Sequence, residues 1–346
     1  MSQAPERAPG GYVTASIWLG LALTLLAGLS AGSCMLPLKY ARRWAWENTW
    51  LIFNLASLVV LPWTLALLLV NNLGGVYAAL SPSQFVAPVL FGAGWGIAQV
   101  LFGLTITRLG VALGYAIIVG LGALLGSLVP LVVNNRAVLS TSKAAVIAAG
   151  LLLMIIGISL CAWAGKRRES GAPAAPGAGY ALALSLAILC GLMAPMLNYA
   201  FAFGQQIASE AVRQGTSPQA ASYAVWPVAL LGGLVPNVLY SLYLLRRNGT
   251  WKHFRHAWFP DAGFGISMAV LWMGAMAVYG VGSVFLGALG TSLGWALFQI
   301  FMVMTANMAG ILSGEWKSAS PVARYSQYGG LALLALATCV IAAGNA

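Results

Sequence analysis

The stretch LGVALGYA at residues 109–116 recurs as LGTSLGWA at residues 289–296, a shift of 180 residues. The register then holds without a gap as far as residue 151 of the first copy. With a slightly different offset, residues 27–31 also match residues 190–194. The chain is therefore predicted to contain an internal repeat whose second copy occupies its C-terminal half.

The composition excludes a soluble protein. Of the 346 residues, 60% are hydrophobic and 7% are charged, against roughly 25% charged residues in soluble domains. The mean hydropathy of +0.87 requires lipid as the solvent for much of the chain. Six acidic residues and two histidines leave little material for acid-base chemistry or metal binding. We therefore expect a transporter or channel and not an enzyme, with no metal and no cofactor.

Apolar runs of about 20 residues, the length that crosses a bilayer, predict ten membrane-spanning helices. The boundary between the eighth and ninth helices, near residues 281–284, rests mainly on length. The predicted spans cover about residues 14–36, 47–70, 85–106, 109–133, 142–164, 179–206, 218–245, 262–282, 284–312 and 322–343.

Each copy of the repeat contains five spans, an odd number, so the second copy is predicted to cross the membrane in the opposite sense. Inverted repeats place a solute site near the bilayer midplane, between two halves that rock against each other. We predict an all-α membrane protein with ten transmembrane helices in two inverted five-helix repeats. The first repeat covers residues 1–168, a cytoplasmic linker covers 169–178, and the second repeat covers 179–346.

The 17 Lys and Arg residues indicate the orientation, because basic residues near helix ends stay preferentially in the cytoplasm. Most of them follow odd-numbered spans, which predicts that both chain termini face the periplasm. The net charge of +11 then needs no nucleic-acid partner, and it suits anionic membrane lipid. Thirteen residues follow odd-numbered spans, namely Lys39, Arg42, Arg43, Arg108, Lys166, Arg167, Arg168, Arg246, Arg247, Lys252, Arg255, Lys317 and Arg324, and four lie on the other side, namely Arg7, Arg136, Lys143 and Arg213.

Several short segments are distinctive in their order and spacing: PLK at 37–39, WAWE at 44–47, FGAGWGI at 91–97, GLT at 103–105, CG at 190–191, GG at 232–233 and EWK at 315–317. In these segments the chain resembles the L-rhamnose/proton symporter family, a branch of the drug/metabolite transporter superfamily. The resemblance implies the drug/metabolite transporter fold, the inner membrane of a bacterial cell, and proton-driven uptake of L-rhamnose or a related deoxy sugar. It also implies an acidic residue early in the ninth span and an amide in the eighth, where this chain has Thr291-Ser292 and Gly274-Ala275.

A sugar site needs amides and hydroxyls for the sugar OH groups and an aromatic face for the C–H surface. Trp95 and Gln99 are four residues apart and so share a helix face, as do Trp295 and Gln299. The alternative roles are packing or interface anchoring for a tryptophan and an interhelical hydrogen bond for a mid-span amide. The candidate substrate-binding residues are Trp95, Gln99, Tyr115, Asn198, Tyr199, Trp226, Asn237, Trp272, Tyr279, Trp295 and Gln299.

Proton coupling requires a group that titrates within the membrane, and carboxylates are the first choice. Glu47, at the start of the second span, is the nearest candidate for the proton carrier. Its alternative role is structural, because a carboxylate there suits the helix dipole and can pair with the basic residues of segment 39–43. The scarcity of acids keeps a second hypothesis open: a proton-independent facilitator, exchanger or exporter of another small metabolite.

Overall fold

The regular structure of the described residues is entirely helical. The computed structural model describes residues 10–109, 111–168, 180–255 and 258–345. Ten helical segments in these ranges are long and apolar enough to cross a membrane, which confirms the predicted all-α membrane protein with ten spans. The linker predicted at residues 169–178 lies outside the described residues.

The first five spans include one irregular helix, the second. It changes from α-helix to π-helix and back directly before Pro62, which has no backbone N–H to donate. The elements are α1 (Gly10–Ser33), η1 (Leu36–Tyr40), α2 (Trp46–Leu55), η2 (Ala56–Val60), α3 (Leu61–Leu69), α4 (Leu73–Ala78), α5 (Pro82–Leu109), α6 (Val111–Asn134), η3 (Arg136–Ser140) and α7 (Lys143–Arg168).

The sixth span, predicted as one helix, consists of three pieces. The first break precedes Pro195 and the second falls at Gly204, and the helix continues past the predicted end. Broken helices free backbone groups, which transporters use near their solute sites. The elements of the second half are α8 (Tyr180–Met193), α9 (Met196–Phe203), α10 (Gln205–Arg213), α11 (Pro218–Ala221), η4 (Ser222–Ala224), α12 (Val225–Asn248), η5 (Thr250–Arg255), α13 (Trp258–Phe285), η6 (Gly287–Leu289), α14 (Leu293–Leu312) and α15 (Pro321–Asn345).

The boundary predicted between the eighth and ninth spans was wrong. The eighth helix continues beyond residue 284, and the ninth begins only at Leu293. Between them Gly287 has a φ of 70°, which turns the chain. The turn is tight, since a Cβ on Gly290 would overlap the Ser283 carbonyl oxygen. The residues of this turn are nearly as apolar as the helices, so the hydropathy pattern did not reveal it.

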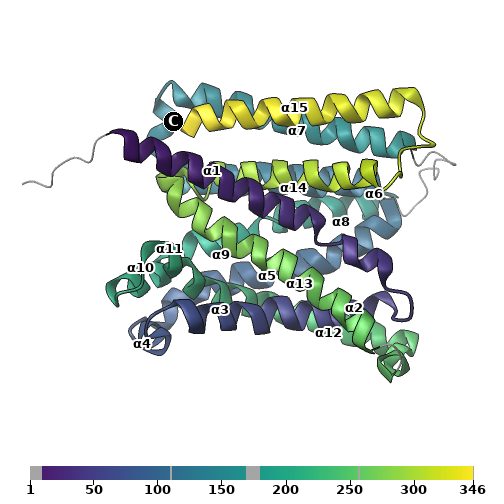
Figure 1. The fold of residues 1–346 in the computed structure, drawn as a ribbon, viewed down its shortest axis with the longest axis horizontal. Helices are drawn as coiled ribbons and strands as arrows, with labels where there is room; N and C mark the ends of the chain where they lie inside the picture. The colour runs from purple at the N-terminus through teal and green to yellow at the C-terminus, as the bar shows by residue number, and fades with distance from the viewer. Residues whose placement is uncertain (1–9, 110, 169–179, 256–257, 346) are drawn as a thin grey trace, which may run out of the picture.

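Helices from the two halves of the chain pack against each other throughout the bundle. α5 packs along α12, α7 along α15, and α1 against α13 and α14 (Figure 1). The first helices of the second half, α8 and α9, pack against α5 and α6. In the predicted repeat α1 corresponds to α8 and α9, α5 to α13, and α6 to α14. The contacts of α1 with α13 and α14 therefore correspond to those of α8 and α9 with α5 and α6, which supports the predicted repeat. The opposite sense of the second copy stays a prediction.

The crossing of α5 and α12 is close enough to exclude side chains. A Cβ on Gly92 would overlap the Ala229 carbonyl oxygen, and one on Gly232 would overlap the Val89 carbonyl oxygen. Small residues permit this approach of two backbones, which is a common way of packing helices in lipid. The crossing fixes α5, and with it Trp95, relative to the second half of the chain.

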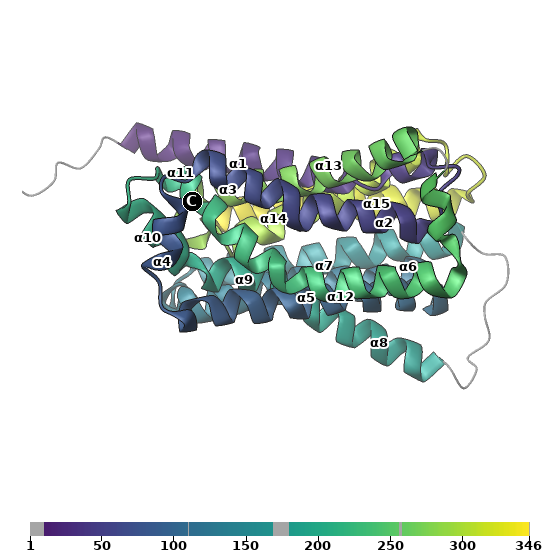
Figure 2. The same cartoon turned by 90° about the horizontal axis from the view of Figure 1, so that it is seen from below.

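The two ends of the helical bundle carry different structural elements. The start of α1 and the end of α15 lie at the same end, as Figures 1 and 2 show. The short helices α4, α10 and α11 lie at this end too. An even number of crossings brings both ends of the chain to one side of the membrane. The assignment of that side to the periplasm stays a prediction.

Candidate substrate site

Asn198 is the centre of a buried polar group that joins several helices. It lies in α9, directly after the break at Pro195, and its side chain is fully buried. The Asn198 amide nitrogen donates to the carbonyl oxygens of Gly126 (2.9 Å) and Thr291 (2.7 Å). Its side-chain oxygen accepts from the Tyr279 hydroxyl at 2.8 Å. All three bonds reach other elements, so this amide joins α9 to α6, to α13 and to the turn before α14.

Two further side chains donate to the same stretch of α6. The Tyr199 hydroxyl donates to the Leu125 carbonyl oxygen at 2.8 Å, and the Trp295 indole nitrogen donates to the Gly122 carbonyl oxygen at 3.2 Å. These carbonyls are accessible because α6 has glycines there, and a Cβ on Gly126 would overlap the Trp295 indole. Three predicted site residues, from α9 and α14, therefore bond to the same stretch of α6, and Tyr279 of α13 joins them through Asn198.

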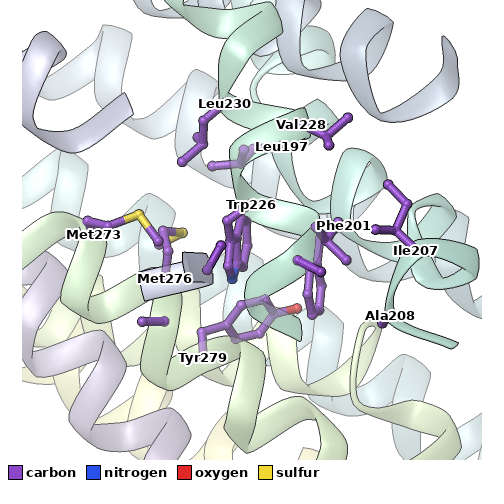
Figure 3. Packing of buried hydrophobic residues seen from close by; sticks show 14 of the residues in the cluster. Leu197, Phe201, Ile207, Ala208, Trp226, Val228, Leu230, Met273, Met276 and Tyr279 are labelled. Atoms are coloured by element: carbon purple, nitrogen blue, oxygen red, sulfur yellow. The ribbon is translucent and has the colours of Figure 1, made fainter. Parts of the chain in front are cut away.

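A stack of aromatic rings extends from this polar group. Trp226 lies flat on Phe201, with centroids 4.7 Å apart and an interplanar angle of 5°. Phe201 contacts Tyr279, and Tyr279 contacts Trp295 with centroids 5.6 Å apart. Figure 3 shows Trp226, Phe201 and Tyr279 side by side, with Met276 on the side of the indole away from Phe201.

The indole nitrogen of Trp226 is buried and has no hydrogen-bond partner in the described part of the chain. A buried donor without a partner is costly, because it has lost its hydration. The arrangement thus leaves one N–H in the aromatic stack available for an additional acceptor.

Trp95 and Trp272 form a second aromatic surface. Their rings are stacked with centroids 5.3 Å apart at 20°. Trp95 comes from α5 and Trp272 from α13, so the pair joins one helix of each half. The Trp95 ring also lies against Gly233 of α12, where a Cβ would come within 2.8 Å of the ring. Trp95, Trp226, Tyr279 and Trp295 belong to one buried hydrophobic cluster, and Trp272 packs against it.

Four other predicted site residues have no hydrogen bond to the polar group among the described residues. Asn237 is buried, but its amide nitrogen donates to the Gly233 carbonyl oxygen of its own helix at 2.9 Å and more weakly to Gly96 at 3.5 Å. Tyr115 packs in a different hydrophobic cluster, with its ring 6.4 Å from that of Phe102. Gln99 is half-buried and Gln299 is buried. Their places in a substrate site stay predictions.

Glu47 is buried at the start of α2 and is 5% exposed. Its Oε1 atom accepts from the Thr250 hydroxyl at 2.7 Å and from the Asn248 amide at 3.0 Å. Both donors are neutral. Glu47 forms no ion pair with Arg42 or Arg43 among the described side chains, and the predicted partner Lys39 has a side chain that lies outside them. Glu47 therefore links the second span to the end of the seventh through neutral hydrogen bonds.

Asp261 is a buried acid that sequence reasoning missed. It lies in the first turn of α13 and accepts from the backbone N–H groups of Arg42, Arg43 and Trp44, at 3.4, 3.1 and 3.0 Å. A carboxylate that satisfies three backbone donors fixes the connection between the first two spans onto the eighth. The available signal was an acid directly after Pro260, one residue before the start of the predicted eighth span.

Comparison with known proteins gives matches along nearly the whole chain. A family model described as L-rhamnose-proton symport protein matches residues 13–346. A relative from Escherichia coli named L-rhamnose-proton symporter is 24% identical over 314 residues, covering 88% of this chain and 91% of the relative. A relative of the same name from Mannheimia succiniciproducens is 25% identical over 311 residues, covering 87% and 90%. The match along nearly the whole length shows that this chain belongs to the L-rhamnose-proton symport protein family.

Proposed function

We propose that this protein is a secondary active transporter that imports L-rhamnose or a related deoxy sugar by proton symport with alternating access. The observation that carries the proposal is the family match over residues 13–346. The relatives named above match at comparable length, so the proposal concerns the whole chain. This membership favours symport over the proton-independent facilitator, exchanger or exporter.

The chemistry around Asn198 suits a sugar. A deoxy sugar presents several hydroxyls and an apolar C–H surface, and the group offers an amide, a phenol and stacked indoles. In the sugar-free chain these polar groups bond to one another and to carbonyls of α6. A sugar that replaces these bonds must supply matching hydroxyls, so analogues that lack one leave a buried group unpaired and bind weakly.

The way the halves pack supports alternating access. The polar group joins α6 of the first half to α9, α13 and α14 of the second. Sugar hydroxyls that compete for Asn198 and Tyr279 would loosen these interhelical bonds and bias the relative position of the halves. The first repeat is residues 1–168 and the second residues 179–346, with both termini in the periplasm and the basic connections in the cytoplasm.

Glu47 is the proposed proton carrier. Both of its side-chain hydrogen-bond donors, Asn248 and Thr250, contact Oε1. A proton on Oε2 therefore leaves the bonds from Asn248 and Thr250 in place. Glu47 lies at the end of the bundle predicted to face the cytoplasm, where an imported proton would leave.

The experiment is uptake of labelled L-rhamnose into proteoliposomes with and without an imposed pH gradient. Symport is expected to concentrate the sugar only when the outside is acidic, and a protonophore should abolish the accumulation. Equilibration that is insensitive to the gradient would retain the sugar site and overturn the coupling. Absence of uptake of L-rhamnose and of related deoxy sugars, with folded protein in the vesicles, would overturn the proposed substrate class.

A further inference from the structure

A groove runs along the outer side of α6 and α7, away from the proposed substrate site. It has a volume of about 550 Å³. One wall extends from Leu113 past Gly120 to Leu124 on α6, and the other from Ile155 to Lys166 on α7. The α6 carbonyls that bind Asn198 and Trp295 belong to residues that do not line the groove. The groove is therefore separate from the polar group.

The length of the groove matches one leaflet of a bilayer. Leu113 and Leu124 are eleven residues apart on α6, which corresponds to about 17 Å at 1.5 Å per residue. This is about half of the roughly 30 Å hydrocarbon core. The middle is open, because a Cβ on Gly120 would meet no atom within 4 Å. A linear apolar ligand can therefore lie along the groove within one leaflet.

The end of the groove at the last turn of α7 is basic. Lys166 lines it, and the neighbouring Arg167 guanidinium lies 4.8 Å above the ring of Trp163, which also lines it. No carboxylate among the described residues pairs with Lys166. Arg168, two residues after Lys166, is by contrast bonded to Glu315 at 2.9 Å. The Lys166 charge is therefore available to an anion at the membrane surface.

We propose that this groove binds one anionic glycerophospholipid, with its phosphate at Lys166 and an acyl chain against Gly120. The assignment rests on two features of the groove, its apolar walls and the cation at one end. The walls are apolar with Ser159 as the only polar uncharged side chain lining the groove, and the cation lies at the end where a headgroup would be. A free phosphate would use Lys166 but none of the apolar wall. This lipid site is independent of the proposed sugar transport.

The test uses the full chain, purified in mild detergent, stripped of lipid and titrated with phosphatidylglycerol or phosphatidylcholine. Native mass spectrometry counts the bound lipids. We expect one phosphatidylglycerol to bind at least about tenfold more tightly than phosphatidylcholine. Gly120→Leu fills the groove and should abolish retention of either lipid. Its matched control is Gly274→Leu, which also has open space but lies on the face of α13 with exposed Ile266 and Val270.

A second variant tests the headgroup contact without changing the groove. Lys166→Gln should remove the preference for phosphatidylglycerol, whereas Lys252→Gln, an exposed lysine in η5, should keep it. Equal affinity of the wild-type chain for the two lipids would overturn the anionic assignment. Unchanged retention in a folded Gly120→Leu protein, or equal losses in Gly120→Leu and Gly274→Leu, would overturn the groove as the site.

Discussion

The hydroxyl of Tyr279 in α13 donates a 2.8 Å hydrogen bond to the side-chain oxygen of Asn198 in α9. The amide nitrogen of Asn198 is already engaged by carbonyls of Gly126 and Thr291. Tyr279 thus satisfies the remaining polar atom of an amide that joins four segments of the bundle. Every bond of this amide crosses between elements, so a solute that binds it necessarily changes contacts between helices.

Tyr279→Phe should lower both stability and sugar affinity. Loss of this hydroxyl leaves the Asn198 oxygen unpaired and costs about 0.6–2 kcal/mol. L-rhamnose binding should weaken by at least about tenfold if the phenol is also a sugar ligand. Thermal unfolding in detergent and equilibrium binding measure the two effects. Tyr77→Phe is the matched control, since its hydroxyl donates to the Ala224 carbonyl oxygen at 2.8 Å at the end of the bundle. Equal affinity in both variants would exclude Tyr279 from the sugar site.

Trp95→Ala and Gln99→Ala should both abolish sugar binding but differ in stability. Trp95 stacks on Trp272 and packs in the main buried cluster, so its truncation should cost about 3–5 kcal/mol. Gln99 is half-buried and its side chain makes no hydrogen bond to another described residue, so its loss should leave the unfolding temperature nearly unchanged. Binding and thermal unfolding of the purified variants distinguish the two. Wild-type affinity in both would refute the assignment of this helix face to the site.

Glu47→Gln should eliminate proton-driven accumulation but preserve exchange of sugar across the membrane. The amide oxygen of glutamine can still accept from Thr250 and Asn248, so the local contacts survive while the titratable group is lost. Uptake and counterflow in proteoliposomes separate the two activities. Asp261→Asn is the control, because this acid binds backbone N–H groups and is assigned no proton. Wild-type accumulation by Glu47→Gln would return Glu47 to a structural role.

Gly92→Ala and Gly232→Ala should each destabilise the protein by at least about 1–3 kcal/mol, because the added methyl group would overlap a carbonyl of the opposite helix. Gly274→Ala, with no atom near its Cβ, should instead be neutral or stabilising by up to about 1 kcal/mol through helix propensity. The unfolding temperature in detergent measures both. Unchanged stability of the Gly92 and Gly232 variants would contradict the close crossing of α5 and α12.

The ten spans could be predicted because lipid imposes a simple rule of length and hydrophobicity, to which almost every span conforms. The turn between the eighth and ninth spans could not, because Gly287 and Gly290 interrupt the helix without any charged residue nearby. Because side chains on all faces of a span are mostly apolar, the hydropathy pattern does not show which face of the span is buried. Hydropathy therefore did not reveal that the sixth span breaks at Pro195 and turns Asn198 towards α6.

Contacts between residues far apart in the chain limited the prediction of the site. Spacing placed Trp95 and Gln99 on one helix face, but the partner of Trp95 is Trp272, on a helix of the other half. The role of Asp261 depends on backbone groups more than 200 residues earlier, at Arg43 and Trp44. A single sequence carries no record of such pairs. Residue type therefore predicted which residues belong to the candidate site better than it predicted which residues contact one another there.

The intertwining of the two halves has a consequence for biosynthesis. Gly96 of α5 and its hydrogen-bond partner Asn237 of α12 are 141 residues apart. At roughly 5–20 residues per second, about 7–28 s pass before the ribosome has made the helix on which α5 will pack. During this interval α5 is without its main neighbour. The five early helices must therefore wait in the membrane, with their small-residue surfaces exposed to lipid or to an insertion chaperone, until the second half is synthesised.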